Sequence, residues 1–250
     1  MPPPARCGSR RFVAQSWPFA RVRAVGKAFD GTLNDAVLAV CAGALRRHLI
    51  AEGDLPAHSL KAMAPISLRA EGDLDSANAV GFLTADLATN IADPDKRFAA
   101  IRHSMQAGKQ QLAGMTPREI ELYTVVTQGP MLLSTVLGLA SRFPAFSTVV
   151  SNVPGPRETM YWNGARLDGI YPASIPFHGF ALNITLVSYG GNLDFGIAAC
   201  RRSVPRVQRL IDYMEEALVE LEVTAGLRKA PRKTGAARRG RTRTATRVRP

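Results

Sequence analysis

Apolar residues change their spacing partway along this 250-residue chain, and this change restricts the fold more than any other feature. The longest apolar segments before about residue 143 follow the period of an α-helix, whereas residues 146–200 are mostly alternating or β-branched. A last helical pattern follows Ser203 and fades near Gly226. The spacing therefore predicts a mixed α/β domain of the two-layer α+β type, with helices flanking a mixed sheet.

The expected helices have recognisable start signals. Thr32 with Asp35 three residues later is an approximate capping box, and Asp93 followed by Pro94 is a usual helix start. Four helices are expected before the spacing changes, at 19–29, 32–53, 93–114 and 116–143. Ser203 is expected to cap the last one.

Strands are expected where apolar residues alternate or β-branched residues cluster. They fall at 61–69, 78–89, 146–153, 165–174, 179–189 and 193–200. Gly190, Gly191 and Asn192 separate the last two, which predicts a tight hairpin there.

The segment "VVSNVPGP" ends a strand abruptly, because Pro154, Gly155 and Pro156 follow directly after the polar pair Ser151 and Asn152. A hydroxyl or amide fixed at a strand end, without a neighbouring base, is suited to donating a hydrogen bond to a developing oxyanion. The alternative is that both side chains only satisfy the backbone of the turn.

No catalytic base is recognisable from the residues alone. The four histidines, His48, His58, His103 and His178, form no pair and no HExxH spacing. The nucleophile elbow, the Walker loop and a GxGxxG motif after a strand are also absent from the sequence. His178 is the least ordinary of the four, because it precedes an expected strand in a loop.

Cysteine usage and apolar run lengths indicate a cytoplasmic protein. Cys7, Cys41 and Cys200 show no metal-ligand spacing, and the last two are expected to be core thiols. The longest apolar runs have about half the ~20 residues of a spanning helix, and no apolar stretch of signal-peptide type follows the N-terminus. No metal and no bound cofactor are expected.

The net charge of +12 comes from the C-terminal end of the chain. Residues 228–250 hold ten of the 32 Lys and Arg and no acidic residue, so the rest carries 22 basic against 20 acidic residues. The tail has no aromatic residue for base stacking, so contact with nucleic acid is not favoured, and an anionic membrane or lipid-droplet surface suits it better. Residues 1–11 and 227–250 are expected to be disordered, leaving 12–226 as the folded lobe.

Three blocks in this order resemble the C-terminal half of the bacterial wax ester synthase/diacylglycerol acyltransferase family. They are "TLNDAVLAVCAGALRRHL", "VVSNVPGP" and "IPFHGFALNITLVSYGGNLDFG" followed by a final helix. The resemblance implies a lobe similar to chloramphenicol acetyltransferase, with acyl-CoA as a substrate and a lipid alcohol or diacylglycerol as the acceptor. It also implies that a histidine of an HHxxxDG motif in an N-terminal lobe acts as the general base.

The resemblance assigns roles to residues of this chain. Ser151 is expected to stabilise the oxyanion, with Asn152 as its supporting neighbour, and Asn34 and Asp35 match the "ND" block as cap or lobe-orienting residues. His178, Asn183 and Thr185 are expected to contact substrate. Structural roles are expected for Pro154, Gly155, Pro156 and Gly196. In the "LDFG" block, a packing role for Gly196 is favoured over a catalytic role for Asp194.

Because HHxxxDG is absent from these residues, the chain is expected to be inactive alone and to need a partner lobe. Two alternatives stay open. The chain could be a non-catalytic binding protein that uses its basic tail on anionic lipid or nucleic acid. It could also be an autonomous acyltransferase or hydrolase in which His178 of one copy serves as the base for Ser151 of another.

Overall fold

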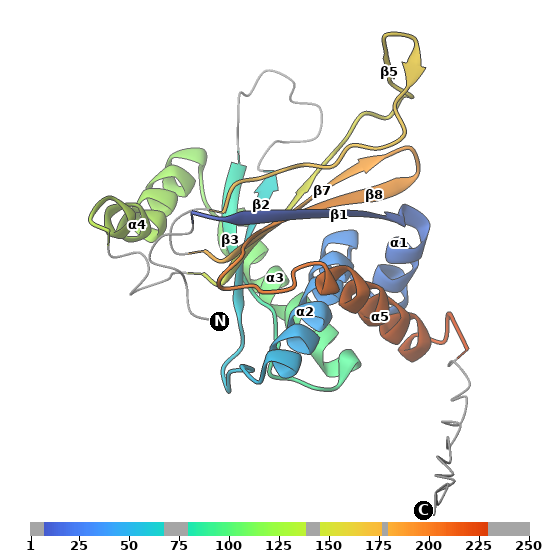
Figure 1. Ribbon diagram of the computed structural model, residues 1–250. Helices are drawn as coiled ribbons and strands as arrows, with labels where there is room; N and C mark the ends of the chain where they lie inside the picture. The colour runs from blue at the N-terminus through green and yellow to red at the C-terminus, as the bar shows by residue number, and fades with distance from the viewer. Residues whose placement is uncertain (1–7, 68–79, 139–145, 177–179, 230–250) are drawn as a thin grey trace, which may run out of the picture.

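The computed structural model describes residues 8–67, 80–138, 146–176 and 180–229. Its centre is a six-stranded mixed sheet of order β1-β8-β7-β4-β2-β3 (Figure 1). The strands are β1 (Arg10–Pro18), β2 (Lys61–Ser67), β3 (Val80–Asp86), β4 (Thr148–Val153), β7 (Leu182–Tyr189) and β8 (Asn192–Cys200). β4 is parallel to both of its neighbours, β2 and β7, and the other pairs are antiparallel. The predicted fold class is confirmed.

Four helices form a layer on one face of the sheet, which is the lower face in Figure 1. They are α1 (Phe19–Ala28), α2 (Leu33–Glu52), α3 (Pro94–Ala113) and α5 (Arg209–Thr224). α2 is apolar around most of its circumference and packs against α1, α3 and α5, so it is the central helix of this layer. The main hydrophobic core lies between the layer and the sheet.

The opposite face of the sheet has a smaller core of Met63, Phe146, Val149 and Phe180. Two elements extend from the body of the molecule, the helix α4 (Pro117–Val136) and the short hairpin of β5 (Tyr161–Trp162) and β6 (Ala165–Arg166) (Figure 1). Both leave apolar side chains exposed, and Trp162 near the hairpin turn is 81% accessible.

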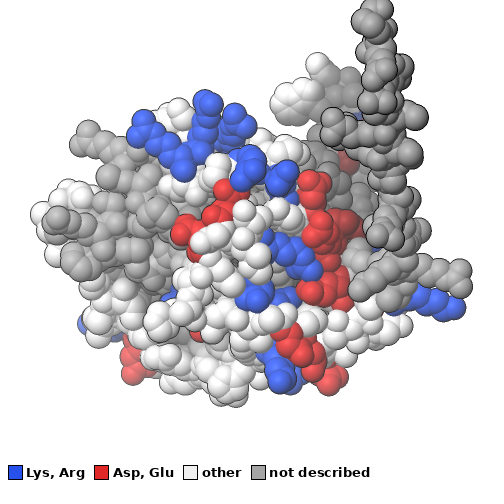
Figure 2. Space-filling view, turned by 60° about the horizontal axis from the view of Figure 1, so that its bottom comes forward, with Lys and Arg blue, Asp and Glu red and all other residues white. Residues whose placement is uncertain are grey.

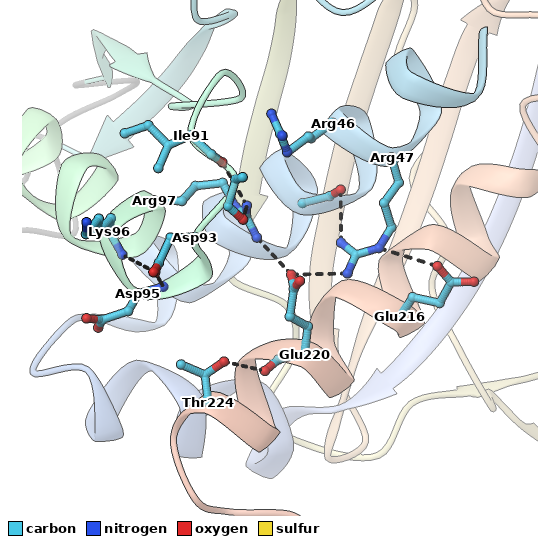
Figure 3. Close-up of polar contacts among 12 residues, drawn as sticks. Arg46, Arg47, Ile91, Asp93, Asp95, Lys96, Arg97, Glu216, Glu220 and Thr224 are labelled. Carbon is cyan, nitrogen blue, oxygen red and sulfur yellow. Dashed lines mark hydrogen bonds and ion pairs between the residues drawn. The ribbon is translucent and has the colours of Figure 1, made fainter. Parts of the chain in front are cut away.

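Ion pairs connect the helices at the surface of the layer. Glu220 of α5 accepts from both Arg97 of α3, at 2.8 Å, and Arg47 of α2, at 3.1 Å (Figure 3). Arg97 is buried and also donates to the carbonyl oxygens of Ile91 and Ala92. Acidic and basic side chains are interspersed over the face turned forward in Figure 2.

Several sequence expectations about local structure were wrong. β1 was not predicted, and of the strand expected at 165–174 only Ala165–Arg166 pairs. The last helix begins at Arg209 and not after Ser203, because the chain between them forms turns and Arg206 has a left-handed φ of 57°. Cys41 is a buried free thiol as expected, whereas Cys200 is disulfide-bonded.

Within the described ranges, no individual helix combines the length and apolar composition needed to cross a bilayer. α1 and α2 taken together pass that test of length and composition, but they are bent by 98°.

Candidate active site at the end of β4

The polar pair predicted to be functional lies at the carboxyl end of β4, next to β7. Ser151 is in register with Thr185, and Asn152 is in register with Leu186. Successive side chains of a strand point to opposite faces of the sheet. Val149 belongs to the smaller core and Val150 to the main core, so Ser151 lies on the face away from the helices and Asn152 on the helix face. The side chains of Ser151 and Asn152 therefore lie on opposite faces of the sheet, although the sequence analysis expected them to share one site.

Ser151 is half-buried, and its hydroxyl makes no hydrogen bond to any residue that the structure describes. Its strand neighbour Thr185 is buried and donates to Asn183 Oδ1 at 2.9 Å. Ser174 Oγ lies 2.8 Å from Thr185 Oγ1. Thr185 Oγ1 thus has described partners, whereas the Ser151 hydroxyl has none and is left to donate to a ligand.

Asn152 bonds instead to the first turn of α2, with its Nδ2 donating to Asn34 Oδ1 at 2.7 Å. The two amides border a pocket between α2 and the strands β2 and β4. Its other walls are apolar and include Leu38, Ala64 and Met105. The bond joins two segments 118 residues apart in the chain, a contact that the sequence did not predict.

Asp35 caps α2 as the sequence predicted. Its Oδ2 accepts from the backbone nitrogen and the hydroxyl of Thr32, both at 2.7 Å, and Thr32 Oγ1 accepts from the Asp35 nitrogen at 3.3 Å. The cap fixes the start of α2, and with it the position of the adjacent Asn34.

The turn after β4 is held against the end of β7. Gly155 N donates to Ser188 Oγ at 3.3 Å, and a Cβ at Gly155 would collide with the Ser188 carbonyl oxygen. Pro154 follows the last strand residue and cannot extend the ladder, because it lacks a backbone N–H. The Pro154-Gly155-Pro156 turn thus fixes where β4 ends.

Gly196 and Asp194 of β8 contact the chain around Ile170 and Pro172, which lies over the face of the sheet away from the helices. A Cβ at Gly196 would collide with the carbonyl oxygen of Pro172. The buried Asp194 accepts from Ser16 Oγ at 2.6 Å and from the backbone nitrogen of Ile170 at 2.8 Å. Both residues therefore have contacts that hold the chain around Ile170 and Pro172 in place.

His178 lies outside the described residues. Among the residues that are described, no group of three or more His, Cys, Asp and Glu could hold a metal ion. His48 is buried against Tyr213 in the helix layer, and burial lowers its pKa below the usual value.

Solved structures with this architecture include an acyltransferase and domains of polyketide and nonribosomal peptide synthases. A wax ester synthase/diacylglycerol acyltransferase from Marinobacter aquaeolei VT8 superposes with a TM-score of 0.78 at 42% identity, covering 90% of this chain and 53% of that one. A condensation domain of the enacyloxin polyketide synthase superposes with a TM-score of 0.56 at 15% identity, over 90% of this chain and 43% of its own. At that identity the second likeness shows the fold alone.

The family model for the WS/DGAT C-terminal domain matches residues 76–222. An O-acyltransferase WSD of Acinetobacter baylyi is 47% identical over 210 residues, which are 84% of this chain and 46% of that protein. A putative diacylglycerol O-acyltransferase of Mycobacterium tuberculosis is 47% identical over 221 residues, 88% of this chain and 49% of its own. The chain belongs to the wax ester synthase/diacylglycerol acyltransferase family. It spans about half the length of these curated relatives.

Proposed function

We propose that this chain is the C-terminal lobe of an O-acyltransferase that moves a fatty acyl group from acyl-CoA to diacylglycerol or a long-chain alcohol. The acceptor oxygen attacks the thioester carbon while a general base takes the hydroxyl proton. The tetrahedral intermediate then collapses, the C–S bond breaks, and the CoA thiolate leaves and takes up a proton. No prosthetic group is needed for this step.

The observation that supports this role is the hydroxyl of Ser151, which lies at the end of β4 without a hydrogen-bond partner in the described structure. A donor whose position is fixed before the reaction lowers the energy of the oxyanion formed from the thioester carbonyl. The base is supplied by the HHxxxDG histidine of an N-terminal lobe, whichever polypeptide carries it.

Exposed apolar surface supports contact with such a lobe. Leu122, Val125, Val126, Leu133 and Val136 of α4 are all at least 60% accessible, and so are Tyr161 and Trp162 of the β5–β6 hairpin. Large apolar areas of this kind are typical of interaction sites. We propose the N-terminal lobe as the partner of this surface.

The test is a Ser151→Ala variant, mixed with the N-terminal half of the Acinetobacter relative and supplied with palmitoyl-CoA and hexadecanol or dioleoylglycerol. Loss of one oxyanion donor should lower kcat by about 10²–10³-fold with KM little changed. Ser203 is also half-buried and has no described hydrogen bond, so Ser203→Ala is the matched control. Equal kcat values for the two variants would exclude the oxyanion role of Ser151.

A further inference from the structure

Arginines gather at one end of the sheet, where β1 starts and β8 ends. Arg10 of β1 is in register with Cys200, the last residue of β8, and the backbone nitrogen of Arg201 donates to the Ser9 carbonyl oxygen at 3.0 Å. The start of β1 therefore lies beside the segment that leads from β8 to α5 (Figure 1). Residues 8–13 and 200–209 contain no Asp or Glu. We call their six arginines the arginine patch: Arg10, Arg11, Arg201, Arg202, Arg206 and Arg209.

The positive charge of the arginine patch is largely uncompensated. All six residues are exposed, and Arg206 donates to Glu52 at 2.6 Å. The other five make no ion pair and no side-chain hydrogen bond with any residue that the structure describes. In the helix layer, by contrast, Arg21, Arg47 and Arg97 each pair with a glutamate of α5. Five unpaired positive charges close together create a potential that attracts an anionic partner.

The arginine patch is separate from the proposed reacting centre. Ser151 is in register with Thr185, Thr185 with Gly196, and Gly196 with Ala14, so β1 is three strands away from β4. Arg10 lies four residues before Ala14 along β1. These strand and residue spacings place Arg10 about 20 Å from Ser151. A partner bound at the patch would therefore leave the surroundings of Ser151 open.

The surroundings of the patch suit an anionic bilayer better than a nucleic acid. Guanidinium groups bind phosphate and carboxylate groups through paired hydrogen bonds. Phe12 is 46% accessible and lies on the same face of β1 as Arg10, because the two are two residues apart in the strand. An exposed apolar ring beside basic side chains is typical of proteins that bind at a bilayer interface. Phe12 is the one aromatic residue of the two segments, whereas single-stranded nucleic acid is bound by several rings that stack on successive bases.

We propose that the arginine patch binds the surface of an anionic lipid bilayer. The inference rests on the proposed function, because a bilayer is where a diacylglycerol or long-chain alcohol acceptor dissolves. A bilayer can touch only part of a rigid surface at once, so the patch adds to the contact expected of the basic residues 228–250 and does not replace it. Those residues bring the chain to the bilayer, and the patch turns this end of the sheet toward it.

The test compares two variants of the intact chain, each with four exposed basic residues replaced by Gln. The patch variant changes Arg10, Arg11, Arg201 and Arg202. The control variant changes four exposed basic residues outside the patch, namely Arg23, Lys27, Lys96 and Arg118. Both variants lose the same net charge. Binding to vesicles of phosphatidylcholine and phosphatidylserine is titrated at physiological ionic strength, and thermal unfolding checks that each variant is folded.

The patch variant should bind the vesicles much more weakly than the control variant does. Each arginine held at an anionic bilayer raises the affinity by about fivefold. Loss of two or more such contacts should weaken vesicle binding by about twentyfold or more, whereas the control should weaken it by less than about threefold. Equal weakening by the two variants would overturn the proposal, because net charge alone would then explain the binding.

The vesicle titration needs no partner lobe and no substrate, so its outcome is separate from that of the acyl transfer. Vesicle binding through the patch, together with a mixture of lobes that releases no CoA, would support the membrane surface and contradict the proposed function. A parallel titration uses a short DNA duplex in place of the vesicles. If the patch variant loses affinity for the duplex but keeps its affinity for the vesicles, the patch binds nucleic acid and the membrane proposal is wrong.

Discussion

Replacing Arg97 by Met should destabilise the fold, because this buried guanidinium connects α3 to α5. It donates to the carbonyl oxygens of Ile91 and Ala92, at 3.0 and 3.1 Å, and to Glu220 at 2.8 Å. The side chain is 2% accessible, and burial lowers its pKa below the ordinary value. Methionine would fill a similar volume but leave these acceptors without their donor.

The expected loss follows from how many of these acceptors remain dry. An acceptor left unsatisfied costs about 1–3 kcal/mol when it is fully buried. Ala92 is exposed, so water can replace part of its loss, and Glu220 retains Arg47 as a partner. Removing the charge also relieves some cost of desolvation. Together these contributions predict a loss of about 2–4 kcal/mol in the free energy of unfolding.

Urea denaturation followed by far-UV circular dichroism measures this loss, because urea does not screen ion pairs as guanidinium chloride does. Arg102 is the matched control. It also donates to two carbonyl oxygens, those of Phe29 and Asp30, but it is only half-buried. Arg102→Met should cost less than about 1 kcal/mol, since water can replace the lost donor. If the two variants lose the same stability, burial is not what makes Arg97 important.

Three other predictions concern separate parts of the chain. The free energy of unfolding should fall as the pH drops below about 6.5, because burial lowers the pKa of His48 and the unfolded chain therefore binds the proton more tightly. In urea titrations at several pH values, His48→Phe should make the free energy of unfolding depend less on pH, whereas replacing the exposed His103 should not. Gly196→Ala should lower the melting temperature through its clash, by about 1–3 kcal/mol of stability, whereas Gly114→Ala, which has open space, should not. Deleting residues 230–250 should abolish flotation with phosphatidylserine vesicles. About 0.5 M salt should do the same for the intact chain, because salt screens binding by charge. Flotation that survives both changes would place the lipid contact outside residues 230–250.

The sequence predicted elements best where local signals agreed with tertiary packing. α2 and α3 begin at their predicted caps, and the β7–β8 hairpin turns at Gly190 and Gly191 as expected. Each of these signals acts within a few residues, through capping or turn geometry. Such features can be found without knowing the rest of the fold.

The missed elements depend on contacts that are distant in the sequence. β1 is an edge strand in which Val13 and Trp17 are buried against the core while most other residues are exposed, so it has little apolar alternation. The candidate site also depends on contacts between residues that are distant in the sequence. Ser151 and Asn34 were each identified separately, but the Asn34–Asn152 bond, and which face of the sheet Ser151 and Asn152 each occupy, appear only once β4 is placed in the sheet.

The most direct test of the account is the initial rate of CoA release from palmitoyl-CoA with hexadecanol. It should be measured for this chain, for the N-terminal half of the Acinetobacter relative, and for their equimolar mixture. The mixture should release CoA at a rate well above the sum of the rates of the two halves alone. Equal release by this chain with and without the partner half would contradict it, because catalysis would then not depend on a base from the other lobe.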